Sequence, residues 1–331
     1  MLRFPWRVAS HLARAAQGID VVDATSGDAW VWCARGRPGA GSATLVTRAH
    51  GLEHMTSRDL RRRSRAGQMK LTWKYPVYHG GYRLWEVQRS MTCADGQVLL
   101  NDPDRAYAIT EFGVGADTSV VLPNGVSDGL LGLAPVTPHT DASSPIALAF
   151  VGSWIPRKGT RAVVDMTVAL HARSVPFSLR LLGTGMDRVS VLDEFPVGVR
   201  EQVGVSPRFA PEELPGLLDG ADILVHPSWT EGFSLALVEG MACGLAPVAT
   251  ASGGAASVIR DGETGLLLHD ESALSLADAV MRLAADRALL GRLRVSAQLE
   301  MQRLRWSTVA SRTLAFYRAM MTRRASIVAR T

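Results

Sequence analysis

Short apolar runs alternate along most of the chain with longer segments whose apolar positions recur at helical spacing. The apolar runs predict buried strands at residues 19–24, 43–47, 94–100, 118–122, 146–151, 178–182, 221–225 and 246–250. The helical spacing predicts helices at residues 5–17, 105–110, 211–218, 234–242 and through most of 272–324. Because strands that alternate with helices build parallel, doubly wound sheets, the pattern predicts an α/β fold.

One segment interrupts this alternation. Residues 127–144 are rich in Gly, Pro, Ser and Thr, which is typical of a linker. At 331 residues the chain is long enough for two domains with a core each. We therefore expect a first domain at residues 1–135, a linker at 136–145, a second domain at 146–305 and a final helix at 306–331.

The composition, 47% hydrophobic and 20% charged, indicates a soluble globular protein, and no run approaches the ~18 apolar residues of a membrane-spanning helix. The net charge is +5, with a dense basic cluster between residues 58 and 74. Its members are Arg58, Arg61, Arg62, Arg63, Arg65, Lys70 and Lys74. Together with the aromatic residues Trp73 and Tyr75, the cluster suits nucleic acid, an anionic membrane or a phosphorylated substrate. A solvated helix face explains it equally well.

The cysteines Cys33, Cys93 and Cys243 lie far apart in the sequence and have no spacing typical of metal ligands. An odd number of cysteines without a secretion signal fits a reducing compartment. We therefore expect a cytoplasmic location, or a peripheral one at the inner face of the membrane.

Two carboxylates follow the predicted strand at 221–225. Glu231 comes shortly after that strand, where open α/β sheets bind ligands. Glu239 is eight residues further on, and a helix rising ~1.5 Å per residue would separate the two carboxylates by roughly 12 Å. That separation resembles the span from the sugar to the ribose of a nucleotide sugar. A plainer interpretation is that Glu231 caps the helix and Glu239 is a solvated helix position.

Other strand ends carry residues that suit an anionic ligand. The stretch from Gly152 to Gly159 is a glycine turn with Lys158 near the start of a helix, and such a turn binds phosphate through backbone N–H groups and positive charge. The turns at 183–185 and 252–254 also contain glycine. His50 follows the strand at 43–47 and is placed to reach a ligand, although a lone histidine is more often a loop or core residue.

The run at residues 226–254 contains HPS at 226–228, EGF at 231–233, EGMACG at 239–244 and GG at 253–254. This run resembles the motif of the retaining glycosyltransferases of family 4, and the resemblance extends more loosely over residues 19–126. It implies a GT-B fold, in which two Rossmann-like domains face each other across a cleft. The second domain would hold a nucleotide sugar and the first its acceptor, and the final helix would cross back to the first domain.

The resemblance also implies a role for individual residues. Lys158, with Arg157 beside it, would grip the donor diphosphate. Glu231 would hold sugar hydroxyls, Glu239 would hold the ribose, and His50 would lie over the sugar. Of these, His50, Lys158 and Glu231 are the expected catalytic residues. The rest of the implied donor site is Gly152, Ser153, Gly183, Gly185, Gly232, Phe233, Ser234 and Leu235.

The implied reaction is sugar transfer with retention at the anomeric carbon, and stabilisation of the departing phosphate would be its main catalytic term. No metal and no cofactor beyond the nucleotide sugar are expected. The expected partners are that donor, a glycan or lipid-linked acceptor, and an anionic membrane contacted through residues 58–74, with no nucleic acid. Synthesis of a glycan, glycolipid or surface polysaccharide is the expected setting.

Three departures from the family pattern leave an alternative open. Ser153 stands where an arginine is common, and Ser257 stands where a glutamate is frequent. Roughly 60 residues that usually open the first domain have no counterpart before residue 5, so we expect either a true start upstream of this sequence or an incomplete first domain. The alternative to a glycosyltransferase is therefore a non-catalytic module, left by truncation, that binds a nucleotide sugar or a partner. A nucleic-acid-binding protein is a third hypothesis, which rests only on the 58–74 cluster.

Overall fold

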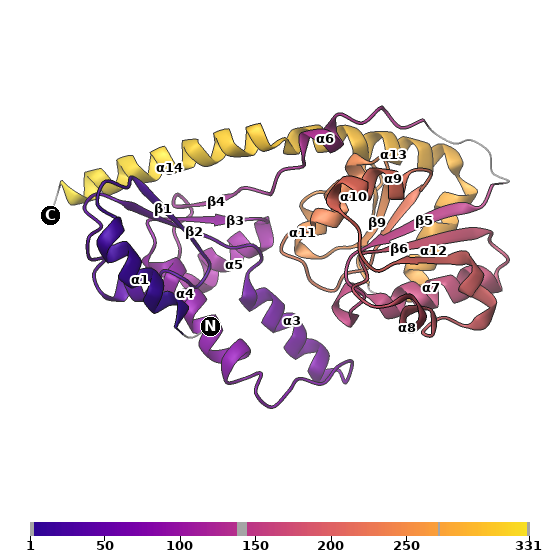
Figure 1. Ribbon diagram of the computed structural model, residues 1–331, viewed down its shortest axis with the longest axis horizontal. Coiled ribbons are helices and arrows are strands. Elements are labelled where there is room, and N and C mark those ends of the chain that lie inside the picture. Colours follow the sequence, from indigo (N-terminus) through magenta and orange to yellow (C-terminus); the bar gives the residue numbers. More distant parts are fainter. Residues whose placement is uncertain (1–2, 138–143, 271, 330–331) are drawn as a thin grey trace. The chain divides into compact units, whose positions relative to one another are not determined.

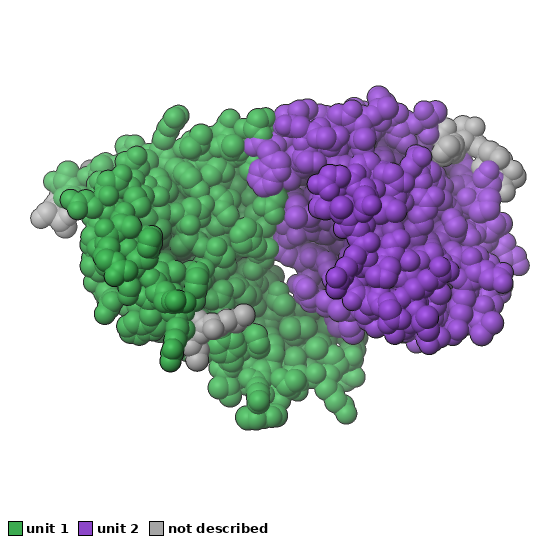
Figure 2. Space-filling model, in the orientation of Figure 1, with its two compact units in different colours: residues 1–124, 307–331 green, residues 125–306 purple. Residues whose placement is uncertain are grey.

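The computed structural model describes residues 3–137, 144–270 and 272–329 and divides into two compact units. Unit 1 consists of residues 1–124 and 307–331, and unit 2 consists of residues 125–306, as Figures 1 and 2 show. Residues 138–143 of the expected linker lie outside the described residues. Each unit is built on a parallel sheet with helices packed against it, which confirms the predicted α/β class.

Unit 2 contains a six-stranded parallel sheet in the order β10-β9-β8-β5-β6-β7. Its strands are β5 (Ile146–Val151), β6 (Phe177–Leu182), β7 (Val203–Ser206), β8 (Ile223–His226), β9 (Ala246–Thr250) and β10 (Leu266–Leu268). The chain builds outward from β5 through β6 to β7, and then returns to the other side of β5 to add β8, β9 and β10. The strand order therefore reverses between β5 and β8, which is the place where sheets of this kind bind ligands.

Helices cover both faces of this sheet. They are α6 (Asp128–Leu131), α7 (Thr160–Ala172), α8 (Arg188–Leu192), α9 (Leu214–Leu218), α10 (Leu235–Ala242), α11 (Gly253–Ala256), α12 (Ala273–Ala285) and α13 (Arg287–Met301). Short 3-10 helices are η2 (Pro156–Lys158), η3 (Val197–Gln202), η4 (Pro211–Glu213) and η5 (Gln302–Leu304). Figure 1 shows α7 and α12 on one face of the sheet and α10 on the other. The core of unit 2 joins apolar side chains of β5, β6 and β8 to α7, α12 and α13.

Unit 1 contains a four-stranded parallel sheet in the order β1-β2-β3-β4. Its strands are β1 (Val21–Thr25), β2 (Thr44–Arg48), β3 (Gly96–Leu99) and β4 (Ser119–Val121). Its helices are α1 (Phe4–Ala15), α2 (Trp30–Ala34), α3 (Glu53–Arg65), the π-helix η1 (Tyr78–Tyr82), α4 (Arg83–Cys93), α5 (Asp102–Phe112) and α14 (Trp306–Val328). None of the described helices is both long and apolar enough to cross a membrane.

The strand order of unit 1 explains why α14 is part of it. Every connection steps in the same direction across the sheet, and right-handed crossovers then place the connecting helices on one face. The opposite face presents Val46, Val98 and Leu122, and these pack against Phe316 and Tyr317 of α14. The helix at the end of the chain therefore completes the core of the unit formed by its beginning.

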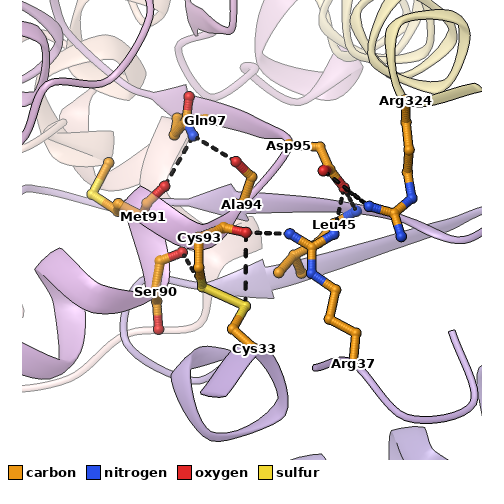
Figure 3. Close-up of polar contacts among 10 residues, drawn as sticks. All are labelled: Cys33, Arg37, Leu45, Ser90, Met91, Cys93, Ala94, Asp95, Gln97 and Arg324. Atoms are coloured by element: carbon orange, nitrogen blue, oxygen red, sulfur yellow. Dashed lines mark hydrogen bonds and ion pairs between the residues drawn. A yellow bond between two sulfur atoms is a disulfide. The ribbon is translucent and has the colours of Figure 1, made fainter. Parts of the chain in front are cut away.

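Polar contacts fix α14 to unit 1, as Figure 3 shows around Asp95. The Asp95 carboxylate accepts hydrogen bonds from the Leu45 backbone N–H at 2.8 Å and from Arg37 at 2.7 Å. It also forms an ion pair with Arg324 of α14 at 3.1 Å. At the other end of the sheet, Tyr317 donates a hydrogen bond to Asp23. Asp95 thus connects a loop, a strand and the final helix.

A disulfide joins Cys33 of α2 to Cys93 at the end of α4, across 60 positions of sequence (Figure 3). Cys243, in unit 2, takes no part in a disulfide. Disulfides are rare in reducing compartments, so this bond differs from the expectation drawn from the number of cysteines. The sequence shows no pattern for the pairing because the two cysteines lie on different helices that only the fold brings together.

Candidate functional site

The candidate site lies in unit 2, at the carboxyl ends of β5 and β8. These two strands are neighbours, paired through Leu148↔Ile223 and Ala149↔Leu224, and the strand order reverses between them. β5 leads into Gly152 and η2, and β8 leads into the loop that begins at Pro227. The two most distinctive stretches of the sequence therefore meet at one edge of the sheet.

Backbone contacts hold these two loops against each other. Gly159 ends η2 with a φ of 74°, and a Cβ atom there would lie 2.1 Å from the Pro227 carbonyl oxygen. The Trp229 backbone N–H donates to the Arg157 carbonyl at 2.9 Å. Both the positive φ and the close approach require glycine at position 159. The loop carrying Lys158 and the loop carrying Glu231 are thus positioned by main-chain atoms.

Lys158 and Glu231 form an ion pair between Nζ and Oε1. Their side chains are only 17% and 10% exposed, respectively. Sequence reasoning selected both residues from separate motifs, and the structure brings them together. The pair places a partly buried cation and a carboxylate side by side at the ligand-binding edge of the sheet.

His226 is the last residue of β8 and the first residue of the HPS motif. Its side chain is only 2% exposed. Burial lowers the pKa of its imidazole to about 4, while Glu231 acts to raise that pKa and Lys158 acts to lower it further. The ring is therefore neutral near pH 7. Its Nε2 has no hydrogen-bond partner among the described residues. The sequence did not predict His226 as a site residue, and the predicted strand ended one residue earlier, at residue 225, with His226 opening the HPS motif.

A third loop supports the segment that follows Glu231. The Gly254 N–H donates to the Glu231 carbonyl oxygen at 3.0 Å, and a Cβ atom at Gly254 would lie 2.9 Å from the Phe233 Cα. Thr250 donates its hydroxyl proton to the Ser228 carbonyl oxygen. The end of β9 therefore holds the loop after β8, and the absence of a side chain at Gly254 allows the two loops to touch.

Residues 232–235 form the entry to α10. Phe233 and Ser234 are buried, whereas Leu235 is 46% exposed. Ser234 is the N-cap of α10, and its side chain makes no capping hydrogen bond. Glu231 lies three residues before that cap and pairs with Lys158, so it is not the helix cap of the plainer interpretation.

Glu231 and Glu239 do not lie on one helix, so the separation of roughly 12 Å predicted from a helical rise was wrong in assuming that they do. Glu239 lies within α10, but Glu231 lies in the preceding loop because the helix begins only at Leu235. A single helical rise therefore does not relate the two carboxylates. Glu239 is partly buried, and burial raises the pKa of its carboxyl. Burial, together with the Glu239 charge, raises the pKa of the neighbouring Cys243 thiol to about 12.

The glycines after β6 and β5 have their N–H groups engaged within unit 2. Gly183 donates to the Ser206 carbonyl at 2.8 Å, and Gly185 donates to the Pro207 carbonyl at 3.0 Å. Gly152 donates to the Leu182 carbonyl at 2.8 Å. These glycines therefore shape the loops around the site, while Ser153 and Arg157 of the same edge are exposed.

His50 is placed in unit 1, directly after β2, with an exposed side chain. Every other residue of the predicted site lies in unit 2. Within the described part of the chain, no three His, Cys, Asp or Glu side chains are grouped as metal ligands would be.

Residues 145–286 match the family "Glycosyl transferases group 1". The chain is 28% identical over 290 residues to the D-inositol 3-phosphate glycosyltransferase of Nocardia farcinica, covering 75% of this chain and 62% of that protein. It is 30% identical over 273 residues to the alpha-maltose-1-phosphate synthase of Mycobacterium tuberculosis, covering 74% of this chain and 69% of that one. The chain thus spans less than two thirds of the length of the first of these relatives.

A solved structure shares the fold over nearly the whole chain. Anabaena Alr3699/HepE in complex with UDP-glucose matches with a TM-score of 0.66 and 19% identity, covering 98% of this chain and 82% of that one. This likeness, together with the two units and their parallel sheets, confirms the GT-B fold that the sequence motif implied. The family match, the identity to the maltose-1-phosphate synthase and the motif at 226–254 lead to one conclusion: the chain belongs to the group 1 glycosyl transferases.

Proposed function

We propose that the chain acts as a retaining glycosyltransferase, which moves a sugar from a nucleotide-sugar donor to a glycan or lipid-linked acceptor. The observation that carries this proposal is the ion pair between Lys158 and Glu231 at the place where the strand order of unit 2 reverses. A relative acts, by its name, on D-inositol 3-phosphate, and HepE was solved with UDP-glucose. Family membership and these names support a nucleotide-sugar donor.

In the proposed mechanism, Lys158 stabilises the negative charge that grows on the departing diphosphate. An ammonium held in a partly buried position is worth more to a developing charge than one in water, because fewer water molecules screen it. Arg157, exposed on the same turn, supplies a second cation. The start of α10 adds backbone N–H groups and the positive end of a helix dipole.

Glu231 has two tasks in this mechanism. It accepts hydrogen bonds from sugar hydroxyls, and it holds Lys158 in position before the donor arrives. Glu239, one turn into α10, accepts hydrogen bonds from the ribose. A neutral His226 behind the pair leaves the charge of the site to Lys158 and Glu231. His50 is proposed to lie over the sugar, no metal is proposed to take part, and the anomeric configuration is retained.

The proposed setting is the synthesis of a glycan, glycolipid or surface polysaccharide in the cytoplasm or at the inner face of the membrane. Contact with an anionic membrane through residues 58–74 has support in exposed side chains of that segment. Trp73 is 80% exposed, and the Lys74 ammonium lies 5.4 Å from its ring centroid.

The test is turnover of nucleotide sugars by the purified chain. Release of nucleoside diphosphate is measured with a panel of donors and acceptors, and the anomeric configuration of the product is read by NMR. We expect Lys158→Met and Glu231→Gln each to reduce turnover by about 10²- to 10³-fold, as loss of one preorganised charge does elsewhere. The matched control is Arg161→Gln, because Arg161 is an exposed cation of α7 paired only with Asp165 in the described structure.

Two results would contradict the proposal. Wild-type turnover in both the Lys158 and Glu231 variants would remove these residues from the reaction, and an inverted product would remove retention. Binding of a nucleotide sugar by calorimetry, with no transfer to any acceptor, would instead favour a non-catalytic nucleotide-sugar-binding module.

A further inference from the structure

A cavity in unit 1 lies along one face of α3, away from the residues of the proposed donor site. It has a volume of about 890 Å³, is open to solvent, and is also lined by Gly80 of η1, Leu84 of α4 and Tyr107 of α5. Six residues of α3 line it, at positions that share one helix face. They are His54, Ser57, Arg58, Arg61, Arg62 and Arg65.

The charge of this helix is not balanced within unit 1. Helix α3 contains five arginines but only two carboxylates, Glu53 and Asp59. Asp59 pairs with both Arg62, at 2.6 Å, and Arg63, at 2.7 Å. Glu53 pairs with Arg83 of α4 instead. Among the five arginines of α3, Arg62 and Arg63 are thus the two that pair with a carboxylate of the same helix.

Three of the four arginines that line the cavity, Arg58, Arg61 and Arg65, form no ion pair with a carboxylate among the described residues. Arg61 donates to the Gly80 carbonyl, which fixes its guanidinium at the wall of the cavity without neutralising it. Arg58 and Arg65 have neither an ion pair nor a hydrogen bond to any residue that the structure describes. Like charges three or four positions apart on a helix repel one another, so this group of arginines would be stabilised by a bound anion.

Two buried polar atoms point to a ligand independently of the arginines. The Ser57 side chain is 3% exposed and lines the cavity, and its hydroxyl has no hydrogen-bond partner among the described residues. The Nδ1 atom of His54, whose ring is partly buried, likewise has no hydrogen-bond partner among the described residues. Buried hydroxyl and imidazole groups are nearly always bonded in folded proteins, and both can donate to an oxygen. Burial lowers the pKa of His54 to about 4, so the positive charge of the cavity comes from its arginines.

We propose that this cavity of unit 1 binds the phosphate group of a phosphate monoester or diester. Guanidinium groups suit phosphate because their planar N–H groups donate in parallel to two of its oxygens. Arg58, Arg61 and Arg65 supply the charge, and the Ser57 hydroxyl supplies a donor at the base. The phosphate belongs either to a small phosphorylated molecule or to a lipid headgroup. The site is distinct from the donor site, so it does not depend on whether the chain transfers sugars.

Binding is tested without any sugar donor. Inorganic phosphate and glycerol 3-phosphate are titrated into the full chain by calorimetry at low salt. The variant Arg58→Gln/Arg65→Gln removes two charges, and it breaks no ion pair or hydrogen bond among the described residues. The variant Ser57→Ala removes the buried hydroxyl. The matched control is Arg14→Gln/Arg89→Gln, which removes two exposed charges of unit 1 outside the cavity.

We expect both phosphates to bind the wild type and the control alike, and affinity to fall about tenfold or more in the double arginine variant. Ser57→Ala weakens binding less, and raising the salt concentration weakens it in every protein. Absence of phosphate binding in the wild type, or an equal loss in the cavity and control variants, would overturn the proposal.

A second arm identifies the source of the phosphate. Vesicles of phosphatidylglycerol and phosphatidylcholine in equal parts are sedimented with each protein. Retention of the wild type and control, with release by the cavity variant, supports a lipid headgroup. Phosphate binding with no vesicle retention supports a small phosphorylated molecule. Vesicle retention that is the same in all the variants, together with no phosphate binding, contradicts the site.

Discussion

The two units contain contrasting examples of how distant segments are held together. In unit 2, loops that end neighbouring strands touch through main-chain atoms and glycines, as at Gly159 with Pro227 and Gly254 with Phe233. In unit 1, side chains from distant parts of the sequence are cross-linked, by the Cys33–Cys93 disulfide and by Asp95 with Arg324. The first arrangement depends on the absence of side chains, whereas the second depends on particular pairs of them. Unit 2 should therefore be sensitive to added atoms, and unit 1 to lost partners.

The largest expected effect is on unit 1, from removal of its disulfide. A cross-link that closes a loop of 60 residues restricts the unfolded chain enough to stabilise the fold by about 4 kcal/mol. We expect Cys33→Ser/Cys93→Ser to lose protection against hydrogen exchange in unit 1, as measured by mass spectrometry, with unit 2 unchanged. A reductant should reproduce the loss in the wild type and add nothing to it in the double variant. Equal protection in all four samples would show that the bond contributes no stability.

The next effect concerns the attachment of α14. Asp95→Asn removes a charge, 20% exposed, that accepts from Arg37, Leu45 and Arg324. Leaving these donors without an anion should destabilise unit 1 by about 2 kcal/mol, measured by urea unfolding and by exchange of α14 peptides. Asp117→Asn is the control, because Asp117 pairs with Arg323 of the same helix but is 65% exposed. Exposed pairs contribute below about 1 kcal/mol. An equal effect of both substitutions would contradict the role of Asp95 as a connector.

A difference of similar size distinguishes added volume from backbone strain in unit 2. Gly159 and Gly262 have nearly equal positive φ angles, 74° and 73°. A Cβ atom would lie 2.1 Å from the Pro227 oxygen at position 159, whereas nothing lies within 4 Å of one at position 262. Alanine should therefore cost the same strain at both sites, plus about 2 kcal/mol of overpacking at position 159 only. Thermal unfolding measures the difference, and equal melting temperatures would show that the loops move apart freely.

The same contrast explains what the sequence could predict. Strands such as 146–151 and 246–250 were predicted at their observed bounds because a fully buried strand is a continuous apolar run. The loops of unit 2 were recognisable because their glycines and charged residues are close in the sequence to the strands that place them. Lys158 and Glu231 could be selected for that reason, although not their direct pairing.

Other features had no local signal. The contacts of Cys33 with Cys93 and of Asp95 with Arg324 join residues 60 and 229 positions apart, and no periodicity reports such distances. The basic cluster at 58–74 was visible, but its meaning depends on which arginines have carboxylate partners. Asp59 is shared by Arg62 and Arg63 while Arg58 has none among the described residues, and only the fold shows this.

Each unit contains a histidine that is shielded from water, His226 buried in unit 2 and His54 partly buried in unit 1. Burial lowers the pKa of both His226 and His54 to about 4, below the usual value near 6.5. The unfolded chain therefore binds these protons more readily than the folded one. Stability is lost as the pH falls from about 6.5 toward about 4. The two rings differ in their surroundings, because Lys158 and Glu231 act on His226 while burial alone acts on His54.

That difference leads to the smallest expected effect, a change of less than about 1 kcal/mol in the free energy of protonation of His226. Lys158 lowers the pKa of His226, so Lys158→Met should raise it, and Glu231 raises that pKa, so Glu231→Gln should lower it. The pKa of His54 should stay the same in both variants. A pH titration of the histidine ring protons by NMR reads both residues in one sample. Shifts of the same sign in the two variants, or equal shifts at His54, would mean that the Lys158–Glu231 pair does not govern the electrostatics around His226.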